Sequence, residues 1–284
     1  MRFGIYWVVH VTMDSKFLIF LTFLTLGNAF PTTKLKAGYQ ELDEWSRFKL
    51  KHLTKNDNIE VYSGQFEGDI VLTQEQLESL MGKNGIIKET KRWINHTVPY
   101  VIKENNFNFE QINYIHKALR QLELVTCLKF VQWTGQQDYL EVAGDIAGCW
   151  TYVGRIGNKQ TLHLEPSALE VNCFRLATIQ HEFMHALGFE HMQSSFDRDD
   201  YVEIKWENLW PGTEHNFEKY NSSVVTGFGV PYDYNSVMHY GPLDFSINGL
   251  QTIVPRDPNA NIGQRTGLSR RDIEKINRMY ECPL

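Results

Sequence analysis

The chain has 284 residues, of which 42% are hydrophobic and 22% are charged, and its formal net charge is −6. This is ordinary globular composition, with ample material for a core. The acidic balance, without a basic run or interleaved aromatic and basic residues, argues against a protein that binds nucleic acid.

The N-terminus carries two short apolar runs. Residues 5–12 and 17–26 are mostly apolar, and charged residues separate them. Neither run reaches the roughly 20 apolar residues of a membrane-spanning helix, so a membrane anchor is disfavoured. We predict a signal peptide over residues 1–29, cleaved after Ala29, with Met13 as a possible alternative start. The protein is therefore expected to be secreted and extracellular.

Residues 30–83 contain no cysteine and are rich in charge. Within them, Thr73 and Gln76 have the spacing of a capping box, which predicts a short helix over residues 73–81. The polar stretch Lys83-Asn84-Gly85 follows and reads as a flexible turn. We place a boundary there, so that a second segment covers residues 84–284.

A longer helix is predicted from Phe107 onward. Asn108 can cap it and Gln111 occupies the third helical position. Apolar residues then fall on one helical face: Ile112, Ile115, Leu119 and Leu122. Short strand-like runs follow at residues 139–142 and 161–164.

Four cysteines occur, all in the C-terminal two-thirds of the chain: Cys127, Cys149, Cys173 and Cys282. None belongs to a C-x-x-C pair, which argues against a structural metal site or a redox motif. In a secreted chain they predict two disulfides, with three possible connectivities. Two sequons, at Asn95 and Asn221, predict N-glycosylation in the same compartment.

Residues 181–191 contain the pattern H-E-x-x-H-x-x-G-x-x-H. His181 and His185 are one helical turn apart, so both imidazoles leave one face of a helix. Gly188 can adopt a positive φ, end the helix and let His191 approach as a third ligand. Three imidazoles with one open position are the arrangement of catalytic zinc. Glu182 lies beside His181 and can reach a water on the same metal.

The helix that carries this pattern is predicted from Leu176 to Leu187. Downstream, residues 236–240 read Ser-Val-Met-His-Tyr. This sequence supplies the Met-turn that completes the metzincin signature. A final helix is predicted after Ser269, with apolar residues facing inward: Ile273, Ile276 and either Met279 or Tyr280.

With these motifs, the chain resembles the astacin family of secreted zinc endopeptidases. The resemblance extends over residues 60–284 and rests on further segments: Trp93, 98–102, 148–150, 197–202 and 262–265. It implies a peptide-bond hydrolase with one Zn²⁺ per chain, which acts on protein or peptide substrates. It also implies a latent zymogen in the family's minimal form. The signal peptide would cover residues 1–29, the propeptide residues 30–83 and the catalytic domain residues 84–284.

The fold implied by the resemblance is α+β with two subdomains and zinc at the floor of the cleft between them. A twisted N-terminal sheet would carry the active-site helix, and a sparser C-terminal part would carry the Met-turn and the final helix. The implied disulfides are Cys127–Cys282 and Cys149–Cys173. A catalytically silent, secreted binding protein is the alternative, but such proteins typically lack the general base or a zinc ligand, whereas Glu182 and all three histidines are present.

The resemblance also implies roles for single residues. The Tyr240 phenol would ligate zinc at rest and then hydrogen-bond the oxyanion, although a buried core tyrosine is the alternative. Met238 would lie beneath the histidines without binding the metal. Asp69, in the segment Phe-Glu-Gly-Asp, would occupy the open zinc position in the precursor; the alternative is a turn residue.

Two further positions concern specificity and maturation. Arg265 would line the pocket for the residue after the scissile bond and favour acidic side chains, unless it forms a structural ion pair. Met192 stands where the family usually has a glutamate that receives the new N-terminal amine, so that amine must use another group or stay undocked. Lys83 suits cleavage by an activating trypsin-like protease.

Overall fold

The computed structural model describes residues 35–53, 57–82, 91–220 and 227–283. Several predictions concern residues outside these ranges: the signal peptide 1–29 with Met13 and Ala29, the boundary at Lys83-Asn84-Gly85 and the sequon at Asn221. Asn95, the other predicted sequon, lies on the surface. No helix among the described residues has the length and apolar character needed to cross a membrane.

A five-stranded sheet forms the N-terminal half of the fold, in the order β2-β1-β3-β5-β4. The first four strands in this order run parallel to one another, and β4 pairs antiparallel to β5 at the edge. Side chains that alternate along β3, such as Leu140 and Val142, are fully buried. The strands span Thr97–Ile102 (β1), Lys129–Gln132 (β2), Tyr139–Ala143 (β3), Cys149–Thr151 (β4) and Lys159–Leu164 (β5). The sequence predicted β3 and β5 but missed the other three.

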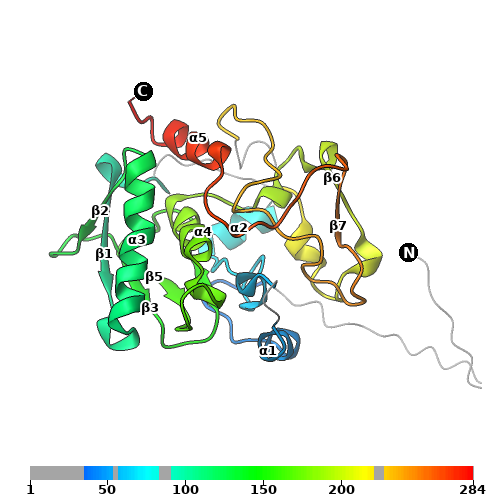
Figure 1. Ribbon diagram of the computed structural model, residues 1–284, viewed down its shortest axis with the longest axis horizontal. Helices are drawn as coiled ribbons and strands as arrows, with labels where there is room; N and C mark the ends of the chain where they lie inside the picture. The colour runs from blue at the N-terminus through cyan, green and yellow to red at the C-terminus, as the bar shows by residue number, and fades with distance from the viewer. Residues whose placement is uncertain (1–34, 54–56, 83–90, 221–226, 284) are drawn as a thin grey trace, which may run out of the picture. The chain divides into compact units, whose positions relative to one another are not determined.

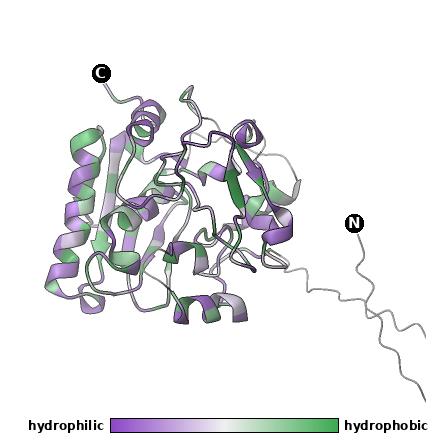
Figure 2. Ribbon diagram, turned by 45° about the vertical axis from the view of Figure 1, so that its right-hand side comes forward, coloured by the Kyte–Doolittle hydropathy of each residue, from purple (hydrophilic) through white to green (hydrophobic). Residues whose placement is uncertain are grey.

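Three helices contribute to the main hydrophobic core: α3 (Phe109–Val125), α4 (Leu176–Leu187) and α5 (Arg270–Met279). Figure 1 shows α3 and α4 beside the sheet. The predicted capping box at Asn108 and Gln111 is present. Ile115, Leu119 and Leu122 are buried, and the hydropathy colouring of Figure 2 shows both hydrophilic and hydrophobic residues along α3. All three helices were predicted from the sequence.

The C-terminal part has little regular structure. Its two-stranded sheet pairs β6 (Val202–Ile204) with β7 (Ile253–Pro255) in antiparallel fashion. A second hydrophobic cluster surrounds this pair and includes Phe217, Tyr240 and Phe245. α5 follows this part along the chain, yet Ile276 and Met279 pack into the first core.

Residues 35–82 pack against the rest of the chain. They form α1 (Glu44–Lys51), a 3-10 turn η1 (Ile59–Tyr62) and α2 (Gln74–Gly82), the last with the predicted Thr73–Gln76 capping box. Between η1 and α2, Ile70 pairs in parallel with Thr151 of β4. The Thr151 amide donates to the Asp69 carbonyl at 2.9 Å. This pairing brings Asp69 to the edge of the sheet.

Two disulfides fasten the fold. One joins Cys127, after α3, to Cys282, after α5. The other joins Cys149 of β4 to Cys173, just before α4. This is the pairing implied by the resemblance, and it leaves no free cysteine among the described residues.

Candidate active site

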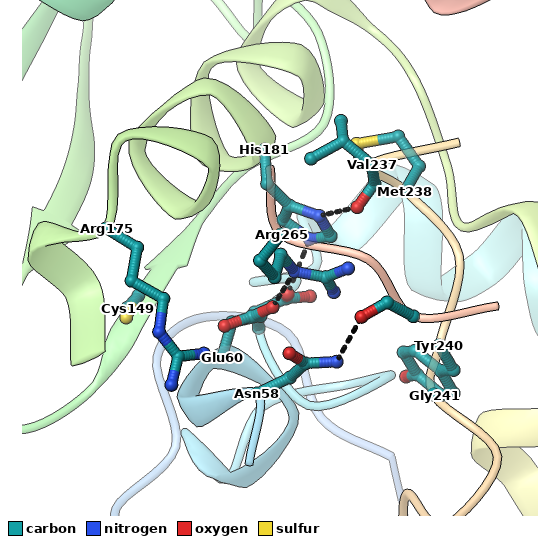
Figure 3. A network of polar contacts seen from close by, with 12 residues as sticks. Asn58, Glu60, Cys149, Arg175, His181, Val237, Met238, Tyr240, Gly241 and Arg265 are labelled. Carbon is teal, nitrogen blue, oxygen red and sulfur yellow. Dashed lines mark hydrogen bonds and ion pairs between the residues drawn. The ribbon is translucent and has the colours of Figure 1, made fainter. Parts of the chain in front are cut away.

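Two of the three motif histidines project from α4. His181 and His185 are fully buried, with their rings 4.7 Å apart. The Nδ1 atom of His181 lies 2.8 Å from the Val237 carbonyl oxygen, as Figure 3 shows, and that of His185 lies 2.7 Å from the Phe189 carbonyl oxygen. A carbonyl oxygen only accepts hydrogen bonds, so the proton of each ring lies on Nδ1. Each Nε2 therefore has its lone pair available to bind a metal.

His191 reaches the same point because the helix stops at Gly188. Gly188 has a φ of 111°, and a Cβ atom there would lie 2.7 Å from the Met279 Cε. Only glycine fits this turn without strain. The Nδ1 atom of His191 contacts a side chain and not a backbone carbonyl: it lies 2.8 Å from Glu67 Oε2.

Four donor atoms converge in the interior. The Nε2 atom of His181 lies 3.1 Å from that of His185 and 3.3 Å from that of His191. Asp69 faces all three, with Oδ2 3.0 Å from His181 Nε2 and Oδ1 3.4 Å from each of the other two. Ligands at about 2.0–2.1 Å from a tetrahedral zinc ion are about 3.3–3.4 Å apart. Asp69 Oδ1 accepts no hydrogen bond among the described residues. The donor set therefore fits zinc.

Glu182 lies on α4 directly after His181 and is fully buried. Neither of its carboxylate oxygens has a hydrogen-bond partner within the described part of the chain. Burial, followed by the nearby charges of Asp69 and Glu60, raises the pKa of this carboxyl well above its usual range. A buried carboxyl without fixed donors is suited to proton transfer rather than to structural support.

The Met-turn contacts the first of the three histidines, because the Val237 carbonyl oxygen lies 2.8 Å from His181 Nδ1. Met238 is buried, and its carbonyl oxygen accepts from the Met192 amide at 2.9 Å. The Tyr240 ring lies 4.7 Å from the His191 ring, and its hydroxyl donates to the Glu67 carbonyl at 2.6 Å. The hydroxyl is thus engaged by residues 35–82, and its roles at the metal and the oxyanion stay predictions.

Arg265 is buried beside the same site and forms an ion pair with Glu60. Figure 3 shows the two side chains meeting between the α4 histidine and η1. The guanidinium also donates to the carbonyls of His239, at 3.2 Å, and Gln264, at 2.8 Å. From the sequence, Arg265 could either line a substrate pocket or form a structural ion pair. The structure has an ion pair whose partner belongs to the segment predicted to be removed.

No role for Glu60 or Glu67 was predicted from the sequence. Glu67 has a φ of 45°, and its carboxylate contacts His191 and also accepts from Ser194 Oγ at 2.9 Å. The next residue must be glycine, because a Cβ on Gly68 would lie 2.7 Å from the Val61 backbone. Glu67 lies 124 residues from His191, and Glu60 lies 205 residues from Arg265, so no local spacing could have predicted these two contacts.

The structure shows what surrounds Met192. Its side chain is buried, and its sulfur accepts a hydrogen bond from the Lys275 ammonium at 2.9 Å. An ammonium group of the protein therefore already lies next to this position.

Comparison with known proteins agrees with these observations. The family model described as Astacin, a peptidase family, matches residues 85–281. Meprin A subunit beta of Mus musculus is 45% identical over 220 residues, which cover 76% of this chain and 29% of that protein. Zinc metalloproteinase nas-4 of Caenorhabditis elegans is 38% identical over 224 residues, covering 76% of this chain and 69% of that protein.

Among solved structures, high choriolytic enzyme 1, a hatching enzyme zinc-protease from Oryzias latipes, is similar with a TM-score of 0.62 and 39% identity. The match covers 68% of this chain and 94% of that one. It confirms the predicted α+β fold. The chain spans about a third of the length of the meprin subunits that it matches. The family match covers well over half of the chain, and the chain therefore belongs to the astacin family of zinc metallopeptidases.

Proposed function

We propose that this protein is a secreted zinc-dependent endopeptidase that is made as a latent precursor. The convergence of three histidine Nε2 atoms and the Asp69 carboxylate, 3.0–3.4 Å apart, carries this proposal. His181, His185 and His191 would hold one Zn²⁺. When bound, zinc supplies a Lewis acid and lowers the pKa of a bound water to about 7.

The protein's own residues then act on the substrate. Glu182 accepts the proton of the attacking water and delivers it to the nitrogen of the leaving amine, so it acts as both general base and general acid. Tyr240 donates a hydrogen bond to the oxyanion that develops at the peptide carbonyl. Its hydroxyl becomes available for this once the Glu67 carbonyl has left.

Latency rests on three buried carboxylates of the propeptide, residues 30–83. Asp69 faces the three histidines. Glu67 contacts Nδ1 of His191, and Glu60 forms an ion pair with Arg265. We infer that Asp69 takes the position that the reacting water needs. Cleavage after Lys83 by a trypsin-like protease would release this segment from the catalytic domain, residues 84–284.

The Glu60 contact also suggests a substrate preference. A guanidinium in a pocket selects carboxylates by charge and by bidentate geometry. Glu60 would act as the stand-in for an acidic side chain that follows the scissile bond. Arg265 would therefore give the activated enzyme a preference for aspartate or glutamate at that position.

Secretion is supported by both disulfides, because such bonds persist in oxidising compartments. Signal peptide cleavage after Ala29 and glycosylation at Asn95 and Asn221 are parts of the same proposal. Intact-mass measurement and N-terminal sequencing of the protein from culture medium would test them.

The activity itself is tested by Glu182→Ala. Removing a general base lowers kcat by about 10²–10⁴-fold. We expect the activated variant to lose peptide hydrolysis by this factor while it keeps one zinc per chain by metal analysis. Glu207→Ala, at an exposed position, is the control for substituting a carboxylate. A silent binding protein would show no turnover in the parent chain at all, and near-parental turnover of Glu182→Ala would disprove the assigned base.

A further inference from the structure

The three histidines differ in the group that contacts Nδ1, the ring nitrogen that does not face the other histidines. His185 meets a backbone carbonyl, and His191 meets the Glu67 carboxylate. Under the proposed function, Glu67 leaves with the propeptide. His181 meets the Val237 carbonyl, and that peptide group connects to a carboxylate within the catalytic domain.

The connection runs through one peptide group and one hydroxyl. The peptide whose oxygen faces His181 has its N–H on Met238, which donates to Ser236 Oγ at 3.1 Å. The Ser236 hydroxyl in turn donates to Asp272 Oδ1 at 2.6 Å. Every step points the same way, from the His181 N–H through the peptide and the hydroxyl to the carboxylate.

Asp272 is held rigidly at the start of α5. It is fully buried, and its Oδ2 accepts from the amides of Val237 and Ser269 at 2.9 Å each. Its own amide donates to Ser269 Oγ, which completes a capping box. Burial raises the pKa of Asp272, and the hydrogen bonds donated by Ser236, Val237 and Ser269 act against that rise.

We propose that Asp272 is a positioning residue of the zinc site that acts on His181 through Ser236 and the Met238 peptide. A carboxylate behind a metal-binding histidine fixes the ring and raises the basicity of the ligating nitrogen. A chain of aligned hydrogen bonds transmits that polarisation, because each bond strengthens the next. In this protein the carboxylate acts at a distance, and it remains in place after the propeptide has gone.

This inference rests on the proposed zinc function, and zinc affinity measured by chelator competition separates the two. If the parent enzyme binds no zinc, the proposed function fails. If it binds zinc, Ser236→Ala and Asp272→Asn should each weaken binding about tenfold, the low end of the effects seen for such partners. Ser236→Thr keeps the hydroxyl and should restore binding.

Ser269→Ala is the matched control for a purely structural role. It removes the capping oxygen of α5 but leaves the Ser236–Asp272 contact in place. Comparable loss of thermal stability without comparable loss of zinc affinity supports the proposal. In the double variant, Ser236→Ala with Asp272→Asn should weaken binding no more than either change alone. Affinities within about twofold of the parent, or strict additivity, would overturn it.

Discussion

Two stretches of chain meet at the three histidines and are held there by different means. α4 is a helix in which every residue from Ala177 to Leu187 is buried, so packing on all sides fixes it. Residues 57–72 contain one short 3-10 turn and isolated bridges that involve Phe66 and Ile70. Their positions near the site depend on the buried carboxylates of Glu60, Glu67 and Asp69 together with buried apolar side chains such as Val61 and Ile70.

The difference explains how α4 can be fixed rigidly while, under the proposed latency, residues 57–72 could be released. The helix shares its core with the sheet, and removing it would expose that core. The other stretch is joined by polar contacts, each of which is strong only while its partner is present, and by buried apolar side chains such as Val61, Tyr62 and Ile70. Trp45 of α1 adds apolar anchoring, because it stacks on Phe245 at 5.2 Å between ring centroids. Under the proposed latency, one cut after Lys83 would therefore free the site without unfolding α4.

The largest effect is expected from Asp69→Ala, which removes the carboxylate that faces all three histidines. Breaking a buried charged contact costs about 3–5 kcal/mol, so the uncut precursor should gain about 10²–10⁴-fold in activity. Peptide hydrolysis by the precursor, with cleavage blocked by Lys83→Ala, measures this. Asp43→Ala, at an exposed cap of α1, is the control. If Asp69→Ala stays as silent as the parent, steric cover by the rest of residues 30–83 explains latency instead.

A smaller effect is expected from Arg265→Gln in the activated enzyme. A hydrogen bond to a charged group contributes about 1.5–3 kcal/mol. The kcat/KM for peptides with glutamate after the scissile bond should therefore fall about 10–100-fold, while peptides with glutamine there should change little. Paired peptides that differ only at this position provide the control. An equal loss for both peptides would mean that Arg265 supports the site structurally and does not select the substrate.

The parts of this site that the sequence predicted are local. The spacing of His181 and His185, the stop at Gly188 and the capping residues of α2 and α3 are each patterns within a few residues of the chain. Such patterns depend on helix geometry, which the sequence displays directly. Two strands, β3 and β5, were also predicted because apolar residues gather in short runs.

The parts that it missed depend on distant partners. β1 and β2 pair with each other although Thr97 and Lys129 are far apart in sequence, and β4 has only 3 residues, so short apolar runs do not reveal these strands. Glu67 meets His191 across 124 residues, and Asp272 meets Ser236 across 36. A carboxylate at a turn or at the third position of a helix has many ordinary uses. Only the folded chain shows which of them reaches a zinc ligand.

The smallest effect is expected from Glu67→Gln. This change tests directly whether the predicted propeptide supports one of the three histidines. Glutamine keeps the size of the side chain and an oxygen that can accept from His191 Nδ1, so only the negative charge is lost. Charge-assisted hydrogen bonds are about twice as strong as neutral ones. The loss should be about 1 kcal/mol, or about a fivefold weakening of zinc binding by the precursor in chelator competition.

The activated enzyme supplies the control for this change. Once residues 30–83 are removed, position 67 is gone, so the parent precursor and the Glu67→Gln precursor should yield enzymes of identical zinc affinity. Asp272→Asn should behave in the opposite way and weaken zinc binding before and after activation alike. If Glu67→Gln leaves the zinc affinity of the precursor unchanged, the propeptide does not support the third histidine. Its charged contacts with the site would then be those of Asp69 and Glu60.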